Sequence, residues 1–355
     1  MSEGSKPPVI ELNDECLIPH LGFGVFQVDE AETEEVVQTA LAAGYRHVDT
    51  AAAYGNERQV GSAVRSVDEH VYVTTKYFDP SDDHGRQGAK AAFAASVERL
   101  GLARVDLYLV HWPVRAGEGF VQSWRGLTEL RDDPGLGPIG VSNFSASQLA
   151  QIIDETGVTP AVNQIEPHPY FRQTELRDEH AGRGIATEAW GPLGQGERHA
   201  AKVLADPTLA EIARAHGKSV GQVVIRWHLQ IGTIVIPKSA NHNRSRENFD
   251  VFGFELSDKD MQSIAALDRN GRNGPDPNTY DRLPRTSART LIARQIGSEA
   301  VVRSAEVPAP LPPFRPRHSV LAAERRADAH FRTHETRAVS TPRAASPRLP
   351  LRAGR

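Results

Sequence analysis

Hydrophobic positions along most of the chain alternate between two spacings. Short apolar runs such as Val71–Thr75 and Asp106–Val110 are typical of buried strands. The longer segments between such runs place apolar residues three or four positions apart, as with Phe93, Val97 and Leu100, which is typical of helices that cover a sheet. The pattern therefore predicts a repeated series of strand–helix units.

The first expected element is a small hairpin, in which Val9–Leu12 and Cys16–Ile18 flank an Asn13-Asp14 turn. Further strands are expected at Leu21–Gly24, Arg46–Thr50, Val71–Thr75, Asp106–Val110, Ile139–Ser142, Ala161–Ile165, Ala186–Ala189 and Thr233–Ile236. Helices are expected at Glu32–Ala43, Glu57–Arg65, Gly88–Leu100, Val121–Arg131, from Ser145 onward, Gln173–Arg183 and Ser219–Ile231. Eight strand–helix units in one unbroken series favour an α/β fold of the closed (β/α)8 TIM-barrel type over an open doubly wound sheet.

Local signals mark several helix ends within this series. The pairs Ser145-x-x-Gln148 and Ser219-x-x-Gln222 are capping boxes, which predict a helix start at each serine. Gly44 and Gly101 follow helical runs directly and are expected to end them.

Past about Tyr280 the alternating pattern ends. The segment Leu283–Arg355 is rich in Arg, Pro and Ala, contains no lysine and has no apolar set of core size. Such a segment buries too little surface to offset its ordering entropy. We expect residues 1–281 to form the barrel domain and residues 282–355 to be a disordered tail. A basic interaction tail and a translated frame-shift or read-through product are the alternatives.

Polar side chains recur at or just past the ends of the expected strands. They are Asp49, Lys76, His111, Asn143, Gln164, Trp190 and Lys238. In a (β/α)8 barrel the carboxyl ends of the strands meet at one face, and that face carries the chemistry. We therefore expect these side chains to gather in one site.

Four residues of this face suit proton transfer to a carbonyl oxygen that receives a hydride. Tyr54 follows Asp49 within one loop. A tyrosine has a pKa near ~10, so proton donation at neutral pH benefits from a nearby cation. Lys76 can supply that charge, and Asp49 can orient Lys76. His111 can hydrogen-bond the substrate oxygen.

Composition narrows the function classes. The net charge of −4 gives no reason to expect nucleic-acid binding. The single cysteine, Cys16, excludes an internal disulfide and fits a reducing compartment. No apolar leader follows Met1, and no run reaches the ~18 apolar residues of a membrane span. No ligand set with metal-site spacing accompanies Asp82-Asp83-His84. We expect a cytoplasmic, monomeric protein without a metal.

Several ordered motifs extend along the chain. They are Gly44–Glu57, V-D-L-Y-L-V-H-W-P at Val105–Pro113, I-G-V-S-N-F at Ile139–Phe144, N-Q-I-E-P-H-P at Asn163–Pro169, A-W-G-P-L-G-Q-G at Ala189–Gly196 and I-P-K-S-x4-R-x2-E-N at Ile236–Asn248. With these motifs the chain resembles the aldo-keto reductases, and among them the bacterial 2,5-diketo-D-gluconate reductases. The resemblance covers about Val9 to Thr279.

The resemblance implies a role for each matching residue. Tyr54 would be the general acid, with Asp49, Lys76 and His111 as its catalytic partners. Ser142, Asn143 and Gln164 would bind the nicotinamide carboxamide, Trp190 would stack on the nicotinamide ring, and Gly191, Leu193, Gly194, Gln195 and Gly196 would follow the pyrophosphate. Lys238, Ser239 and Arg244 would bind an adenosine 2′-phosphate, and Glu247 and Asn248 would contact the adenine. Two cations and a hydroxyl suit a dianionic phosphate, which favours NADPH over NADH.

Two regions concern the substrate. Phe23 and Trp112 lie near the active face and are expected to line the substrate pocket together with His111, with core packing as the alternative. The family closes its pocket with a C-terminal segment, which here would be about Asn270–Asp281. Just after one strand, Glu166-Pro167 stands where the family more often has Glu-Leu.

The expected function is NADPH-dependent reduction of aldehydes and ketones, diketo sugars included, by hydride transfer to the carbonyl carbon. A barrel that keeps the cofactor as a redox sensor or regulatory subunit, with little turnover, is the alternative. A nonfunctional product of a damaged gene is a third, suggested by the tail.

Overall fold

The computed structural model describes residues 7–77, 86–113, 119–194 and 203–279. The first two strands, β1 (Val9–Glu11) and β2 (Leu17–Pro19), pair antiparallel with Ile10 opposite Ile18. This is the predicted N-terminal hairpin, and Glu15 in its turn adopts a left-handed conformation, with φ 67°. The expected tail and the domain boundary at residue 281 lie outside the described residues.

The remaining strands form one parallel sheet whose spatial order follows the chain. They are β3 (Phe23–Gly24), β4 (His47–Asp49), β5 (Tyr72–Tyr77), β6 (Leu107–Val110), β7 (Ile139–Ser142), β8 (Val162–Ile165), β9 (Ala186–Ala189) and β10 (Ile234–Val235). The first and last strands close the sheet, because Gly22 N donates to Val235 O at 2.9 Å and Gly24 N donates to Pro237 O at 3.2 Å. The predicted (β/α)8 barrel is confirmed.

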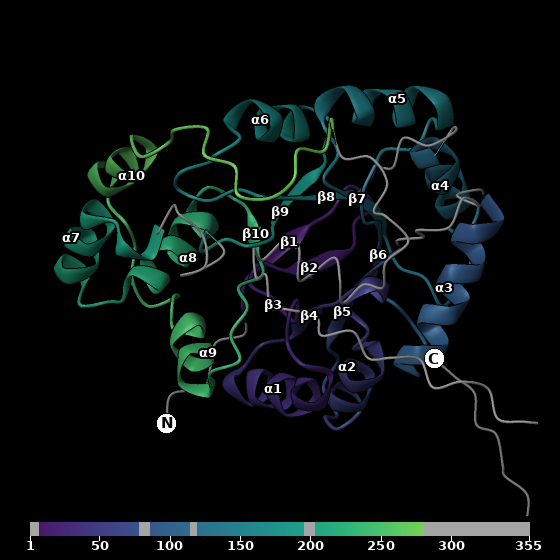
Figure 1. The fold of residues 1–355 in the computed structure, drawn as a ribbon, viewed down its shortest axis with the longest axis horizontal. Coiled ribbons are helices and arrows are strands. Elements are labelled where there is room, and N and C mark those ends of the chain that lie inside the picture. Colours follow the sequence, from purple (N-terminus) through teal and green to yellow (C-terminus); the bar gives the residue numbers. More distant parts are fainter. Residues whose placement is uncertain (1–6, 78–85, 114–118, 195–202, 280–355) are drawn as a thin grey trace, which may run out of the picture. The chain divides into compact units, whose positions relative to one another are not determined.

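Helices surround the strands (Figure 1). They are α1 (Glu30–Ala43), α2 (Glu57–Val64), α3 (Arg86–Leu100), α4 (Gly119–Thr128), α5 (Ala146–Thr156), α6 (Thr174–Gly182), α7 (Pro207–His216), α8 (Val220–Gln230), α9 (His242–Phe249) and α10 (Asp258–Ala265), with short 3-10 turns η1 (Ala52–Tyr54) and η3 (Val203–Ala205). Both capping boxes are present, at the starts of α5 and α8.

The sequence analysis missed three helices, α7, α9 and α10. The start of α7 carries a clear signal, since Asp206 caps it and Pro207 occupies its first turn. The eight residues of α9 have almost no apolar stripe, so periodicity alone does not reveal it. Its start depends on Asn241, whose side chain accepts a hydrogen bond from Arg244 N at 3.0 Å.

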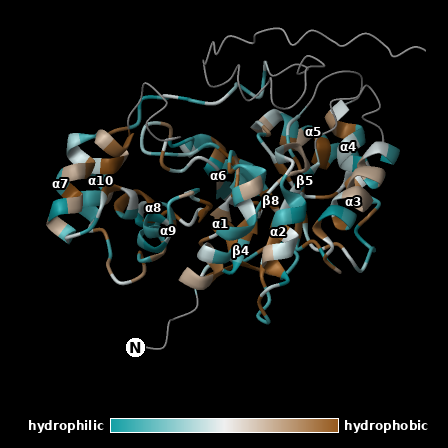
Figure 2. Ribbon diagram, turned by 60° about the horizontal axis from the view of Figure 1, so that its bottom comes forward, coloured by the Kyte–Doolittle hydropathy of each residue, from teal (hydrophilic) through white to brown (hydrophobic). Residues whose placement is uncertain are grey.

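The hydrophobic core has separate layers on the two faces of the sheet. Outward side chains such as Val48, Val73 and Tyr108 pack with Val37 of α1 and Phe93 of α3. Helices such as α3 and α5 carry both hydrophilic and hydrophobic residues (Figure 2), as expected for helices that bury one side. Inward side chains form a second cluster, which the hairpin residues Leu12 and Ile18 complete.

That inward cluster consists of Tyr72, Leu107, Leu109, Ala161, Val162 and Ile234 on or beside the strands, with Leu12 and Ile18 from the hairpin. Side chains two positions apart on a strand point to the same face. Polar residues further along these strands, such as Gln164 after Val162, therefore also point into the barrel interior. A third cluster lies among α7, α8 and α10 and includes Leu209, Trp227 and Ile264. Among the described helices, none is both long and apolar enough to cross a membrane.

Candidate active site

An ion pair lies at the mouth of the barrel, where β4 and β5 end. Lys76 Nζ donates to Asp49 Oδ1 at 2.6 Å and to Asp49 Oδ2 at 2.7 Å. Its third hydrogen bond goes to the carbonyl of Thr50 at 2.8 Å. Both side chains are buried, with exposed fractions of 0% and 4%. An unpaired charge at this depth would be strongly unfavourable. Separating the two side chains would therefore leave two unpaired buried charges, which keeps the ion pair intact.

Tyr54 completes this group from the 3-10 turn that follows β4. Lys76 Nζ lies 5.2 Å from the centre of the Tyr54 ring. The His111 ring, which comes directly after β6, meets Tyr54 edge-on with ring centres 5.7 Å apart. Phe26 also packs against the phenol, at 5.0 Å between ring centres. The structure therefore brings Asp49, Tyr54, Lys76 and His111 together.

Burial and neighbouring charges shift the pKa of Tyr54 in opposite directions. Burial raises the pKa of Tyr54 to about 12, and the charge of Asp49 acts in the same direction. The charge of Lys76 and a hydrogen bond between the two side chains lower the pKa, as predicted, but burial outweighs them. The charge of Lys76 thus acts in the predicted direction, while burial keeps the pKa of Tyr54 above its ordinary value. At neutral pH Tyr54 keeps its proton and can donate it.

Beside this phenol, the His111 side chain is neutral and the Lys76 side chain is charged. Burial, and then the charge of Lys76, lower the pKa of His111 well below its usual value. Its imidazole is therefore neutral at neutral pH and can donate one N–H to an oxygen. Burial alone would lower the pKa of Lys76, but the negative charge of Asp49 raises it above the ordinary value, so the ammonium stays charged.

A second buried carboxylate, Glu188 on β9, belongs to the same network. Gln164 Nε2 donates to Asp49 Oδ2 at 2.8 Å and to Glu188 Oε2 at 2.7 Å. Burial, and then the charge of Asp49, raise the pKa of Glu188 to about 8. The sequence analysis did not select Glu188. The feature that could have revealed it is an acidic residue inside an expected buried strand, Ala186–Ala189.

The residues predicted to bind a nicotinamide carboxamide form a connected set. Asn143 Nδ2 donates to the His111 carbonyl at 3.1 Å and to Ser142 Oγ at 3.0 Å. Asn143 Oδ1 accepts the indole N–H of Trp190 at 2.8 Å. Because Gln164 Nε2 is committed to two carboxylates, Gln164 can offer a ligand only its oxygen. The amide groups are therefore oriented before any ligand binds.

The loop after β9, which is predicted to follow the pyrophosphate, contains a tight turn with two left-handed glycines. Gly191 and Gly194 adopt left-handed conformations, with φ 54° and 72°, and Gly194 N donates to Gly191 O at 2.9 Å. Glycine adopts such conformations readily and lets a backbone approach a phosphate closely. Leu193 lies in this turn, whereas Gln195 and Gly196 lie outside the described residues.

The predicted 2′-phosphate residues surround the start of α9. Lys238 and Arg244 are exposed, whereas Ser239 is buried and its Oγ accepts Asn241 N at 3.1 Å. Glu247 and Asn248 follow on α9, Glu247 exposed and Asn248 buried. Cations beside a helix N-terminus favour a bound anion.

The substrate-pocket expectation needs one correction. Phe23 is only 1% exposed and packs edge-on against Tyr45, with ring centres 5.3 Å apart, in the outward core layer. Its position on β3 has the parity of the helix-facing side, so it does not line the mouth. Phe26, which sequence reasoning missed, contacts Tyr54 instead. Trp112, next to His111, is half-buried.

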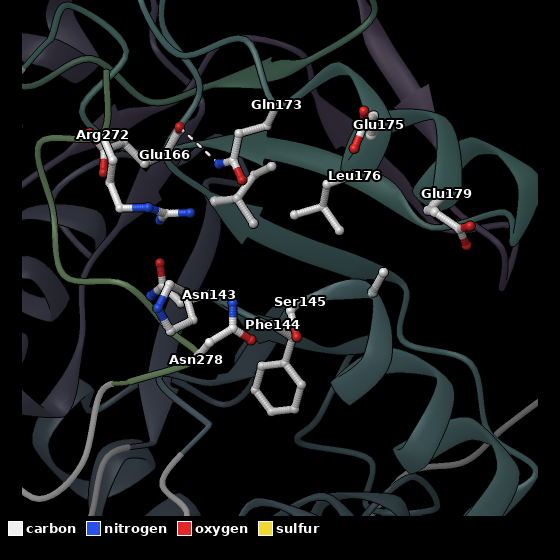
Figure 3. A pocket seen from close by; sticks show the side chains of 13 residues that line it. Asn143, Phe144, Ser145, Glu166, Gln173, Glu175, Leu176, Glu179, Arg272 and Asn278 are labelled. Atoms are coloured by element: carbon white, nitrogen blue, oxygen red, sulfur yellow. Dashed lines mark hydrogen bonds between the residues drawn. The ribbon is translucent and has the colours of Figure 1, made fainter. Parts of the chain in front are cut away.

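A cavity of about 390 Å³ lies beside Asn143, between the starts of α5 and α6. Figure 3 shows the Arg272 side chain extending toward Gln173 and Asn278, with Glu175 and Glu179 of α6 beyond. The cavity shares Asn143 and Glu166 with the barrel mouth. Among the described residues, no cluster of three or more His, Cys, Asp or Glu side chains is placed to hold a metal ion.

Comparison with known proteins agrees with this geometry. Residues 20–269 match the Aldo/keto reductase family. An "Aldo-keto reductase" of Mycobacterium sp. (strain JLS) is 52% identical over 277 residues, which is 77% of this chain and 98% of the relative. The methylglyoxal reductase DkgA of Escherichia coli K12 is 43% identical over 279 residues, 78% of this chain and 99% of the relative.

Comparison with solved structures also indicates the aldo/keto reductase family. A crystal structure of a Gox0644 mutant in complex with NADPH superimposes with a TM-score of 0.73 at 44% identity, and the match covers 78% of this chain and 99% of that one. The chain belongs to the aldo/keto reductase family.

Proposed function

We propose that the protein is an NADPH-dependent reductase that converts aldehydes and ketones, diketo sugars included, to alcohols, with Tyr54 as the general acid. One observation carries the proposal. A protonated phenol, a buried Lys76–Asp49 pair and a neutral imidazole share the barrel mouth with the carboxamide-binding set. The relatives support it, since one is named a methylglyoxal reductase and a Gox0644 mutant is solved with NADPH.

The residues present fit a reduced dinucleotide phosphate. Asn143 and Gln164 offer oriented amides, Trp190 offers a half-buried ring, and the Gly191–Gly194 turn offers backbone. Lys238 and Arg244 offer cations at the start of α9, which suits a 2′-phosphate. When bound, NADPH supplies the hydride.

The chain's own residues would then manage the proton and the oxygen. The neutral His111 donates an N–H to the carbonyl oxygen and holds it beside Tyr54. As negative charge develops on that oxygen, Tyr54 transfers its hydroxyl proton to it. Lys76 stabilises the phenolate that remains, and Asp49 with Thr50 O keeps the ammonium in place. Cytoplasmic location, a monomeric state and the tail boundary remain predictions.

Replacing the proton donor tests the proposal. We expect Tyr54→Phe to lose carbonyl reduction by about 10²–10⁴-fold, the usual contribution of a positioned acid, while NADPH affinity changes little. Steady-state assays with methylglyoxal and a panel of dicarbonyls, together with fluorescence titration of NADPH and NADH, measure both quantities. Tyr72→Phe is the matched control, because among the described residues the buried Tyr72 hydroxyl has no hydrogen-bond partner.

Two results would contradict the proposal. Retained turnover in Tyr54→Phe would remove Tyr54 as the acid. Tight NADPH binding with negligible turnover of every carbonyl by the unmodified protein would favour the sensor alternative.

A further inference from the structure

The segment that follows α10 is attached to the barrel by a carboxylate that the reaction does not use. Glu166 stands directly after β8, and its side chain is fully buried. Its Oε1 accepts the backbone N–H of Asn273 at 2.7 Å, and its Oε2 accepts the backbone N–H of Gly274 at 2.8 Å. One carboxylate thus binds two consecutive N–H groups of a segment more than 100 residues away in sequence.

Further contacts strengthen this attachment, which we call the Glu166 clasp (Glu166, Asn273 and Gly274). His168 Nε2 lies 3.1 Å from Glu166 Oε1 and 3.2 Å from Asn273 Nδ2, so according to its tautomer it either donates to the carboxylate or accepts from the amide. Asn273 Nδ2 also reaches the carbonyl of Gly194, at 3.4 Å, in the loop after β9. The clasp therefore joins the ends of two neighbouring strands, β8 and β9, through the segment after α10.

Two arginines flank the clasp and add to its rigidity. The guanidinium of Arg269 lies 3.7 Å from the centre of the Tyr170 ring. The guanidinium of Arg272 lies 4.5 Å from the centre of the Phe171 ring. Cation–π contacts of this kind favour one position of the segment.

The clasp places Gly274 against the Trp190 ring with no room for a side chain. A Cβ at Gly274 would lie 2.5 Å from Trp190 Cη2 and 2.8 Å from Glu166 Oε2. Trp190 Cζ2 would be 3.3 Å away. The backbone of Gly274 is outside the left-handed region, so glycine is needed here for space and not for conformation.

Trp190 is consequently held at both ends. Its Nε1–H donates to Asn143 Oδ1, at 2.8 Å, and its far six-membered ring meets Gly274. We propose that Glu166 and Gly274 are positioning residues of the cofactor site, which hold the Trp190 ring in the orientation that stacks on nicotinamide. This inference rests on the proposed function, because it assumes that Trp190 meets NADPH.

A double-mutant cycle tests the contact directly. Gly274→Ala forces the Trp190 ring or Glu166 to move, so we expect the Kd for NADPH to rise at least about fivefold, the scale of overpacking in a close contact. In a Trp190→Phe background the clashing ring atoms are gone. The close approach to Glu166 Oε2 remains, but in the proposal it affects NADPH only through Trp190, so Gly274→Ala should change the Kd by less than about twofold. Gly253→Ala is the matched control, since nothing lies within 4 Å of its Cβ position.

A second readout needs no cofactor. The chain has four tryptophans, whose indole N–H groups give separate ¹H–¹⁵N resonances, and Trp190→Phe assigns one of them. Gly274→Ala should shift the Trp190 resonance and leave the other three in place. This measurement also shows whether the variant is folded.

Glu166→Gln tests the other half of the clasp. The amide nitrogen of glutamine cannot accept a hydrogen bond, so one of the two backbone N–H groups loses its acceptor. We expect a higher Kd for NADPH, the same Trp190 resonance to shift, and kcat at saturating NADPH within about twofold of the unmodified protein, since Glu166 does not touch the reacting atoms. Glu175→Gln, an exposed carboxylate in the neighbouring cavity, should leave all three unchanged.

The outcomes separate the two proposals. Unchanged NADPH affinity and an unmoved Trp190 resonance in Gly274→Ala, or an equal loss of affinity in the Trp190→Phe background, would overturn the positioning role alone. Failure of the unmodified protein to bind NADPH would overturn the proposed function itself.

Discussion

The interior of the barrel differs between its two ends, although the same strands build both. At the base, Tyr72, Leu107 and Ile234 pack with Leu12 and Ile18 of the hairpin in an apolar layer. At the mouth, two to four residues further along the strands, the interior holds Asp49, Lys76, Gln164 and Glu188, all of them buried. Neither layer is exposed to water, so the two ends differ in the free energy of burying their side chains.

The base is stabilised by burial itself, at about 25 cal/mol per Å² of apolar surface removed from water. The mouth is different, because buried charges are tolerated only when their hydrogen bonds are satisfied. The Lys76 ammonium uses all three of its donors, and the carboxyl groups of Asp49 and Glu188 share the amide of Gln164. The comparison indicates that burial at the base increases the stability of the fold. Burial at the mouth lowers that stability but holds the charged groups in a fixed arrangement.

Lys76→Met should have the largest effect on the barrel mouth. The substitution leaves Asp49 buried without its cation, so we expect a loss of about 3–5 kcal/mol in the free energy of unfolding. Carbonyl reduction should fall by about 10²–10⁴-fold. Chemical denaturation and steady-state kinetics measure the two effects. Lys90→Met, which removes a solvent-exposed pair with Glu129, should change the free energy of unfolding far less and leave the kinetics unchanged.

Ile18→Ala sharpens the comparison from the base. Ile18 is fully buried beneath the barrel, so its truncation should cost about 2–5 kcal/mol in the free energy of unfolding. Because no charge of the mouth contacts it, kcat/KM should stay within about twofold. Leu17→Ala, in the same strand but 55% exposed, should cost no more than about 0.5 kcal/mol. A comparable loss of activity in Ile18→Ala would show that the two ends are coupled.

Glu188→Gln tests the mouth through its pH dependence. The pKa of Glu188 in the fold is about 8, above its ordinary value of 4.5, so the folded chain binds this proton more tightly than the unfolded chain. Its stabilising contribution is complete below pH 4.5 and is lost as the pH rises toward 8, by up to about 1.4 kcal/mol per pH unit.

The glutamine variant cannot ionise, so its unfolding free energy should fall less than that of the unmodified protein between about pH 5 and pH 8. The groups that face Glu188 are Asp49, His47, Lys76, Tyr54 and Tyr72, and they are common to both proteins. Urea unfolding across this pH range measures the difference. Glu11→Gln, an exposed carboxylate of the hairpin, should follow the unmodified protein, and parallel curves for Glu188→Gln would contradict the assignment.

Much of the architecture was predictable because its signals are local and periodic. Alternation along strands, capping boxes at Ser145 and Ser219, and polar residues at strand ends all act within a few residues. These signals were sufficient for the hairpin and the barrel and for bringing Asp49, Lys76 and His111 to its mouth, but they missed Glu188 and misplaced Phe23. Where periodicity was absent, as in α9, the prediction failed.

The sequence alone therefore determined the barrel and the strand-end positions of Asp49, Lys76 and His111, since strand order and side-chain alternation follow from short-range pattern. The tertiary structure alone decided how those residues behave. Burial and not the neighbouring cation sets the pKa of Tyr54, Phe23 faces the helices, and Glu188 joins Asp49 through Gln164. The clasp on Glu166 likewise joins residues far apart in sequence. Desolvation and long-range contact arise only when the barrel closes, and no local pattern encodes either one.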